Sequence, residues 1–144
     1  MKKILIFLAI VVIIIIVVLV NYSSYIAGKN ALKAENAEYE QYKDKEVFGL
    51  DVATMINKIV DKNTKNEIEK DANGLFVQND TNSIELEIYM VDNETTYKME
   101  TIYNGGTDKF VQYYGNIKFK CSKIEYHQST GKIKYILFEQ LKTS

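Results

Sequence analysis

The longest apolar run of the chain lies at its N-terminus. Residues 4–20 contain no charged side chain, no polar side chain and no glycine. As a helix with a rise of about 1.5 Å per residue, the run is about 25 Å long, close to the hydrocarbon thickness of a bilayer. Tyr22 and Tyr25 follow it, where aromatic rings seat at the lipid headgroups. The pattern predicts a transmembrane helix that contacts membrane lipid.

Charges on either side of this run predict its orientation. Lys2 and Lys3 precede it, and the positive-inside rule keeps such a short basic end in the cytoplasm. The apolar run is longer than the core of a cleaved signal peptide, and bulky residues follow it where the peptidase needs small ones. The sequence therefore favours an uncleaved single-pass anchor in the cell membrane, with an extracytoplasmic C-terminal domain, over a cleaved signal peptide or a buried soluble helix.

The next segment, residues 23–48, reads as a helical stalk. Its residues are good helix formers, and Tyr25, Leu32 and Tyr39 recur every seven positions in a weakly apolar seam. This seam is compatible with a coiled-coil or pilin-like packing helix. The favoured interpretation is a partly solvated helix that docks one edge on its own domain.

A short amphipathic helix should follow the stalk. Asp51 is the expected N-cap and Asn63 the expected stop. Five apolar side chains lie between them at helical spacing and should form one buried face: Val52, Met55, Ile56, Ile59 and Val60.

Strict alternation then predicts a strand over residues 84–90. Its buried side chains should be Ile84, Leu86, Ile88 and Met90. Residues 92–95 turn the chain, and residues 96–103 should return as a second strand. Tyr97, Met99, Thr101 and Tyr103 would share one face of this returning strand.

The last third of the chain predicts a brief helix and a second hairpin. Thr107 should cap the helix, whose apolar side is Phe110, Val111 and Tyr114. Strands should follow over residues 117–127 and 132–140. The apolar positions change parity within the first of them, which predicts a bulge or a switch of face near Ser122 and Lys123.

These elements predict an α+β fold. An N-terminal transmembrane helix extends as a stalk, a short helix follows, and one antiparallel sheet of four to five strands with an inserted short helix completes the chain. The expected boundaries are 1–22 for the cytoplasmic tip and anchor, 23–48 for the stalk and 49–144 for the extracytoplasmic domain.

The amino-acid composition limits the classes of molecule that the chain can bind. Every basic residue is a lysine, and beyond the anchor sixteen lysines face nineteen acids, a net charge of −3. This charge opposes binding to nucleic acid. Abundant Lys, Ile, Asn and Tyr with no Pro or Trp are typical of AT-rich codon usage in a low-GC bacterium. The single cysteine excludes an internal disulfide and is compatible with a Gram-positive surface.

The sequence predicts no catalytic residue and no cofactor. His127 should lie at a strand end as a surface or turn residue, and Cys121 should be a small buried apolar residue. On a regular strand the two would stand about 20 Å apart, too far for a thiol–imidazole pair. Glu85 and Glu87 could bind a cation or pair with lysines of the returning strand, and the cross-strand pairing is favoured.

No metal site is predicted either, although residues 61–82 are rich in Asn and Asp. Asp61 and Asn63 begin like a calcium loop, but Lys65 stands where a ligand belongs. A weak surface calcium held by Asp71, Asn73 and Asp80 is the less favoured alternative.

Eleven tyrosines give a small domain many amphipathic rings. Four of them are candidates for an exposed interaction surface: Tyr89, Tyr113, Tyr126 and Tyr135. Packing of these rings between the stalk and the sheet is equally compatible with the sequence.

Residues 39–58 resemble a pattern found in small single-pass membrane proteins of clostridia and related low-GC bacteria. A tyrosine-bearing helix (Tyr39, Tyr42) precedes Gly49 and a helix containing Asp51-Val52 and Ile56-Asn57-Lys58. The resemblance implies source and topology and assigns no active site. The general plan is also similar to type IV pilins, but the chain lacks their glycine-phenylalanine cleavage site and the early glutamate of the mature helix.

The sequence thus predicts a non-enzymatic, membrane-anchored structural or protein-interaction domain of the bacterial envelope, within a secretion, pilus or mobile-element apparatus. Its partners would be lipid and another protein or a second copy of itself. The alternative is a small-ligand or ion sensor that uses residues 61–82.

Overall fold

The computed structural model describes residues 1–142 and contains two compact units, residues 1–35 and the head domain that starts at Asn36. Apart from Met1, the first unit lies in α1 (Lys2–Glu40), a continuous helix. Among the described residues, α1 is the one helix long and apolar enough to cross a membrane, and its most apolar stretch is not buried. Tyr22 and Tyr25 lie on it with exposed side chains.

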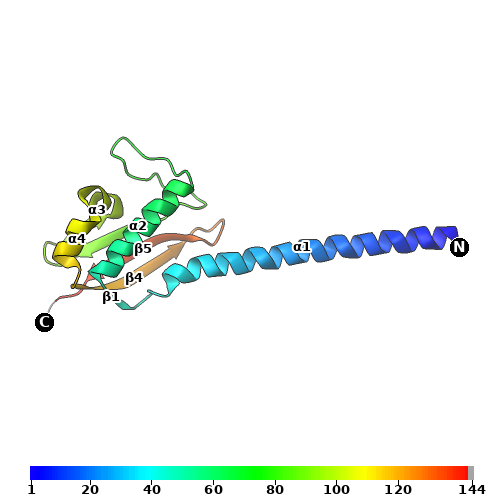
Figure 1. The fold of residues 1–144 in the computed structure, drawn as a ribbon, viewed down its shortest axis with the longest axis horizontal. Coiled ribbons are helices and arrows are strands. Elements are labelled where there is room, and N and C mark those ends of the chain that lie inside the picture. The colour runs from blue at the N-terminus through cyan, green and yellow to red at the C-terminus, as the bar shows by residue number, and fades with distance from the viewer. Residues whose placement is uncertain (143–144) are drawn as a thin grey trace. The chain divides into compact units, whose positions relative to one another are not determined.

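A five-stranded sheet forms the framework of the described part of the head domain (Figure 1). In spatial order it contains β1 (Glu46–Phe48), β4 (Lys118–Tyr126), β5 (Ile133–Gln140), β2 (Glu85–Met90) and β3 (Thr95–Lys98). The predicted α+β class is confirmed. The sheet is mixed, because β2 and β5 run parallel while the other neighbouring strands run antiparallel. Neighbours so far apart in sequence have no hairpin to dictate their direction, so the parallel pair was not predictable from local pattern.

Helices cover one face of this sheet: α2 (Gly49–Lys65), α3 (Met99–Gly105) and α4 (Thr107–Tyr114) (Figure 1). All five apolar residues predicted to face the core from α2 are buried. The four predicted core residues Ile84, Leu86, Ile88 and Met90 are buried as well. Both predictions are confirmed, because a period of 3.6 or 2 places apolar side chains on one face wherever the element packs.

The ends of α2 differ from the prediction. Phe48 is the N-cap, and Asp51 lies three residues later, where its Oδ2 accepts a hydrogen bond of 3.1 Å from the Phe48 amide. Asp51 therefore satisfies a free amide of the helix start without being the cap itself. At the other end, Asn63 does not stop the helix. It is fully buried, and Asn66 takes the C-cap position.

The predicted strand over residues 96–103 is wrong in its second half. β3 ends at Lys98, and Met99 begins α3. Met99 is buried and Ile102 partly buried, a separation of three residues that suits a helix packing on a core. The alternation of Met99, Thr101 and Tyr103 fits a strand equally well, so tertiary packing decided between the two. The brief helix α4 is confirmed, but its N-cap is Gly106, with φ 98°, and not Thr107.

The last two strands form the expected hairpin. Their register shifts between Cys121 and Lys123, which confirms the predicted bulge. Because of the bulge, Phe119, Cys121 and Ile124 are all buried although their spacing changes parity.

Candidate interaction surface

One face of the sheet carries no helix of the described head domain and presents partly exposed side chains. On β2 these are Glu85, Glu87 and Tyr89, which alternate with buried residues. On β5, Tyr135, Leu137 and Glu139 have the same orientation, because Tyr135 pairs with Glu85 and Glu139 with Tyr89 in the parallel register. On β4, Lys120 and Lys123 pair with Glu139 and Leu137 and so lie on this face too. We call this surface the open sheet face.

The structure places the four candidate tyrosines in three locations. Tyr89 and Tyr135 share the open sheet face. Tyr113 lies on α4 and is the most exposed of them, at 73%. Tyr126 lies at the end of β4 opposite the buried Ile133, and therefore faces the helix-covered side. The structure thus brings together two of the four, and local sequence carries no signal for this division.

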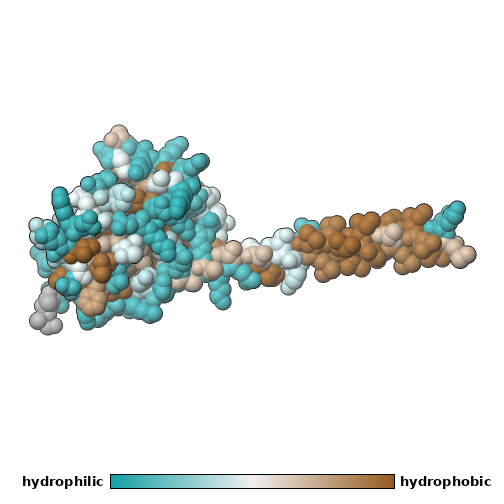
Figure 2. Space-filling model, in the orientation of Figure 1, coloured by the Kyte–Doolittle hydropathy of each residue, from teal (hydrophilic) through white to brown (hydrophobic). Residues whose placement is uncertain are grey.

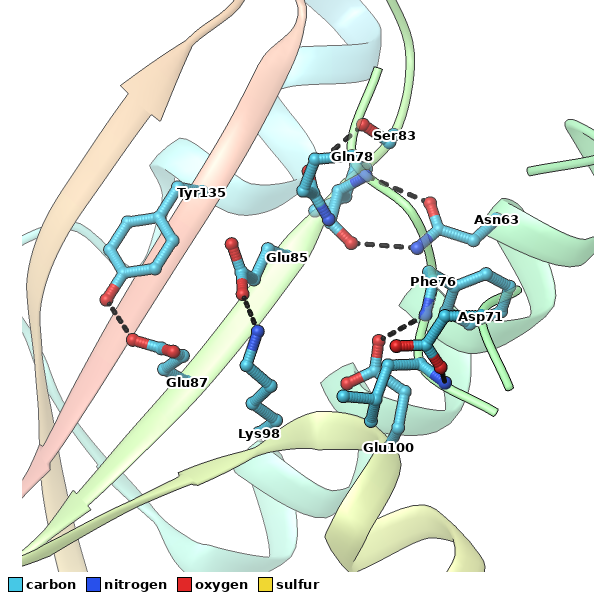
Figure 3. Close-up of polar contacts among 12 residues, drawn as sticks. Asn63, Asp71, Phe76, Gln78, Ser83, Glu85, Glu87, Lys98, Glu100 and Tyr135 are labelled. Carbon is cyan, nitrogen blue, oxygen red and sulfur yellow. Dashed lines mark hydrogen bonds and ion pairs between the residues drawn. The ribbon is translucent and has the colours of Figure 1, made fainter. Parts of the chain in front are cut away.

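Tyr135 is held in a defined orientation on the open sheet face. Its hydroxyl donates a 2.7 Å hydrogen bond to Glu87 Oε2 (Figure 3). Lys123 Nζ lies 5.6 Å from the centroid of its ring. Burial, followed by the Glu87 carboxylate, raises the pKa of Tyr135. The phenol therefore stays protonated at physiological pH and presents a fixed, half-buried ring beside both a cation and an anion.

Ion pairs frame the same face. Lys98 Nζ lies 2.8 Å from Glu85 Oε1, which confirms the expected pairing with the following strand for Glu85, whereas Glu87 accepts its hydrogen bond from Tyr135 (Figure 3). The Glu85 carboxylate raises the pKa of Lys98. Lys118 and Glu46 form a similar pair of 3.0 Å between β4 and β1. Exposed pairs of this kind contribute at most about 1 kcal/mol to stability, so a partner could replace them at little cost.

The last residues of α1 belong to the head domain and dock on it, as the favoured interpretation expected. The predicted helical stalk over residues 23–48 is wrong at its end, because α1 ends at Glu40 and Glu46–Phe48 form strand β1. Tyr39 is 1% exposed within the core. The Asn36 side-chain amide donates to Gly131 O at 2.8 Å, and its oxygen accepts from the Ile133 backbone amide at 3.2 Å. Tyr126 donates a 2.7 Å hydrogen bond to Glu40. Partial burial and this carboxylate raise the pKa of Tyr126 to about 12.

The prediction that His127 is a surface or turn residue is wrong as to burial. It follows β4 directly beside the turn, yet it is only 3% exposed, and its Nε2 lies 2.7 Å from Ser83 O. The loop before β2 covers it, because Ser129 of the hairpin turn donates to Asp80 O and Thr130 donates to Thr81 O. Burial of the ring with a backbone partner gives it a structural role that only the fold reveals.

Cys121 is confirmed as a buried apolar residue. It is fully buried and carries no disulfide. Burial raises the pKa of its thiol to about 11, which keeps it protonated and unreactive.

In the Asn- and Asp-rich segment, residues 61–82, side-chain oxygens accept hydrogen bonds from nearby backbone amides. Asp71 Oδ1 accepts hydrogen bonds from the amides of Asn73 and Leu75, and Asn79 Oδ1 accepts from three successive amides, those of Thr81, Asn82 and Ser83. Residues 1–142 contain no group of three or more His, Cys, Asp or Glu side chains placed to hold a metal ion. These side chains close turns and fix the loop.

Several polar side chains are buried and bind backbone groups, a role that sequence inspection did not predict for them. Asn63 donates to Ile84 O and accepts from the Ile84 amide, and Glu100 accepts from the Phe76 amide (Figure 3). Gln140 accepts from the Val91 amide and donates to Asp92. Each one ties an irregular segment to a regular element.

Comparison of the chain with known proteins finds no matching family model, no similar curated protein and no similar solved structure.

Proposed function

We propose that this protein is a single-pass membrane protein whose head domain acts outside the cytoplasm as a structural or protein-interaction component of a bacterial envelope. The observation that carries the proposal is the unburied apolar stretch of α1 (Figure 2). Leaving apolar surface in water costs about 25 cal/mol per Å², a cost that lipid around the helix removes. The anchor is therefore proposed to remain attached in the mature protein.

The proposed orientation rests on charge. Lys2 and Lys3 lie on the short side of the apolar stretch, and all nineteen acidic residues lie beyond it. The positive-inside rule favours retention of the lysine side and translocation of the head domain.

The proposed interaction role rests on the open sheet face. Tyrosine is enriched in protein interfaces because it supplies a large apolar ring with one polar atom. Tyr89 and Tyr135 lie there beside Leu137 and charges of both signs, all at least partly exposed. A protein partner would bury the Tyr135 ring, which its hydrogen bond to Glu87 already orients.

Topology tests the first part of the proposal. The full-length chain with a C-terminal epitope is expected to resist carbonate extraction from membranes, and protease added to intact cells should remove the epitope. A cytoplasmic protein in the same cells serves as the control for lysis. Protection of the epitope, or release of mature protein that begins after Val20, would overturn the proposal.

Crosslinking in native membranes tests the second part. Lysine-reactive reagents should trap the chain with a protein partner or with a second copy. Substitution of Tyr89 and Tyr135 together by serine should reduce the adducts with a protein partner, whereas Tyr113→Ser, at an exposed position on α4, should not. Recovery of monomer alone under all growth conditions would contradict an interaction role.

A further inference from the structure

The junction between β1 and α2 exposes two large apolar side chains. Phe48 is 50% exposed and Leu50 is 56% exposed. Figure 2 shows apolar side chains gathered at the end of the head domain where α4 and the start of α2 lie in Figure 1. Among the large apolar side chains of the head domain, most lie in the core, so two such neighbours in water are a feature to be explained.

The fold holds this pair rigidly. The Gly49 amide donates to Ile117 O at 2.9 Å, and the Leu50 amide donates to Gly115 O at 3.2 Å. A Cβ on Gly49 would lie 2.0 Å from Tyr114 O, so only glycine permits this approach. Phe48 and Leu50 are therefore presented at fixed positions, which lowers the entropy cost of binding.

A groove of about 410 Å³ lies beside the pair. Phe48, Ile117 and Leu141 supply its apolar side chains. Glu46, Lys118 and Lys142 supply its charges, with Glu46 and Lys118 paired at 3.0 Å. We call Leu50 and this groove together the junction patch.

The junction patch is self-complementary. A two-fold contact between identical chains requires that one surface carry both members of every matching pair, since residue i of one copy meets residue j of the other and the reverse. The patch has an exposed apolar side chain, Leu50, and a groove of mixed lining whose apolar side chains are Phe48, Ile117 and Leu141. It also has an acid, Glu46, and a base, Lys142. An unrelated partner would need only one member of each pair.

The backbone edge at this place is poorly suited to strand addition. β1 is one of the two edge strands of the sheet, but it contains only three residues, and the Phe48 amide is already bonded to Asp51. Short edges of this kind discourage pairing with another strand. Side chains must therefore carry any contact made here.

We propose that the junction patch is the contact between two copies of this chain. Leu50 of each copy enters the groove of the other, and Lys142 of each copy faces Glu46 of the other. The inference rests on the proposed function, because anchoring in one membrane confines the copies to a plane and raises their effective concentration.

Site-directed crosslinking of the full-length chain in membranes tests this contact. Asn116, an exposed residue that lines the groove, is replaced by cysteine, since the native Cys121 is buried. A short bis-maleimide should give an adduct of twice the chain mass. Val77→Cys is the matched control, because Val77 is 47% exposed and lies in the loop before β2.

A second substitution tests the role of Leu50. In the Asn116→Cys background, Leu50→Ser should reduce the adduct about tenfold, the loss expected for a central interface side chain. Val77→Ser in the same background should leave it unchanged. Lys142→Glu should also weaken the adduct by placing two acids together.

The outcomes separate this inference from the proposed function. Equal adducts from Asn116→Cys and Val77→Cys, or an adduct of another mass, would overturn the proposed two-copy contact. So would an absent adduct in membranes where the protease test gives the expected topology, and that result would leave the anchored topology intact. Failure of the protease test would instead overturn the proposed function.

Discussion

Buried polar side chains of the head domain act as links between the backbone of one segment and the side chain of another. Asn63 lies in α2 and bonds both backbone groups of Ile84, with distances of 2.7 Å to the oxygen and 3.0 Å to the nitrogen. An amide side chain has a donor and an acceptor, so one asparagine satisfies both groups of one peptide position. Asn36 links the end of α1 to the β4–β5 hairpin through two different residues, because it donates to Gly131 O and accepts from the Ile133 amide.

The two hydrogen bonds between Asn63 and Ile84 predict a measurable loss of stability when Asn63 is replaced. Asn63→Ala should lower the free energy of unfolding by about 2–4 kcal/mol, because it leaves a buried amide and a buried carbonyl of Ile84 without partners. Urea unfolding of the full chain in detergent, followed by tyrosine fluorescence, measures this. Asn66→Ala is the matched control. It removes one 3.3 Å bond to Asn82 O from a partly buried side chain and should cost less than about 1 kcal/mol.

The burial of Cys121 predicts that its thiol reacts slowly with maleimide in the folded chain. Its pKa is raised from 9.0 to about 11 by burial, so at pH 8 the folded chain should react with maleimide far more slowly than the urea-unfolded chain. Because the folded-state pKa is the higher one, the protonated thiol contributes its stability below pH 9 and loses it as the pH rises through 11. Equal labelling rates for folded and unfolded chain at pH 8 would contradict this assignment, and Cys121→Ser measures background labelling.

At the scale of elements, prediction from local sequence succeeds where an element buries one regular face. α2 and β2 each bury one regular face, so their periodicity alone locates them. α3 is decided by its surroundings, because Glu100 on it accepts a hydrogen bond from Phe76 of a distant loop, and Met99 enters the core. Tyr126 and Glu40 similarly join two elements that are far apart in the chain.

At the junction of β1, α2 and α4, the close approach of the backbone predicts that position 49 tolerates only glycine. Gly49→Ala should destabilise the head domain by about 2 kcal/mol or more, because the added Cβ would lie 2.0 Å from Tyr114 O. Gly105→Ala is the control, since a Cβ there meets nothing within 4 Å. Thermal unfolding monitored by near-ultraviolet circular dichroism compares the two variants. Similar melting temperatures would mean that α4 yields to the added methyl group.

At the scale of the whole molecule, an apolar helix and a compact head domain share one chain. The head domain begins at Asn36, so the last part of the predicted stalk belongs to it. Its core joins α2 to the sheet and includes Tyr39, which explains why α1 continues past the apolar stretch as a helix with one buried edge. The proposed anchoring gives the two units different solvents, lipid for one and water for the other.

The proposed orientation of the chain in the membrane predicts the effect of replacing the N-terminal lysines. Replacing Lys2 and Lys3 together by glutamine should reduce the ratio of protease-accessible to protected C-terminus several-fold, on the order of what loss of the flanking charge bias produces. The matched control replaces Lys29 and Lys33, two lysines on the other side of the apolar stretch. That variant should retain the accessible C-terminus. Unchanged topology in the Lys2 and Lys3 variant would show that these charges do not set the orientation.

The sequence by itself determined the features that depend on neighbours along the chain. These are the apolar run of residues 4–20, the buried face of α2, the alternation of β2 and the bulge beside Ser122, because each follows from backbone period and side-chain polarity. Tertiary structure decided the parallel pairing of β2 with β5, the helix at Met99, the burial of His127 and the division of the four tyrosines. It also decided that Phe48 and Leu50 remain exposed. Each of these depends on segments that meet only in the folded chain, and no local period records which surfaces will meet.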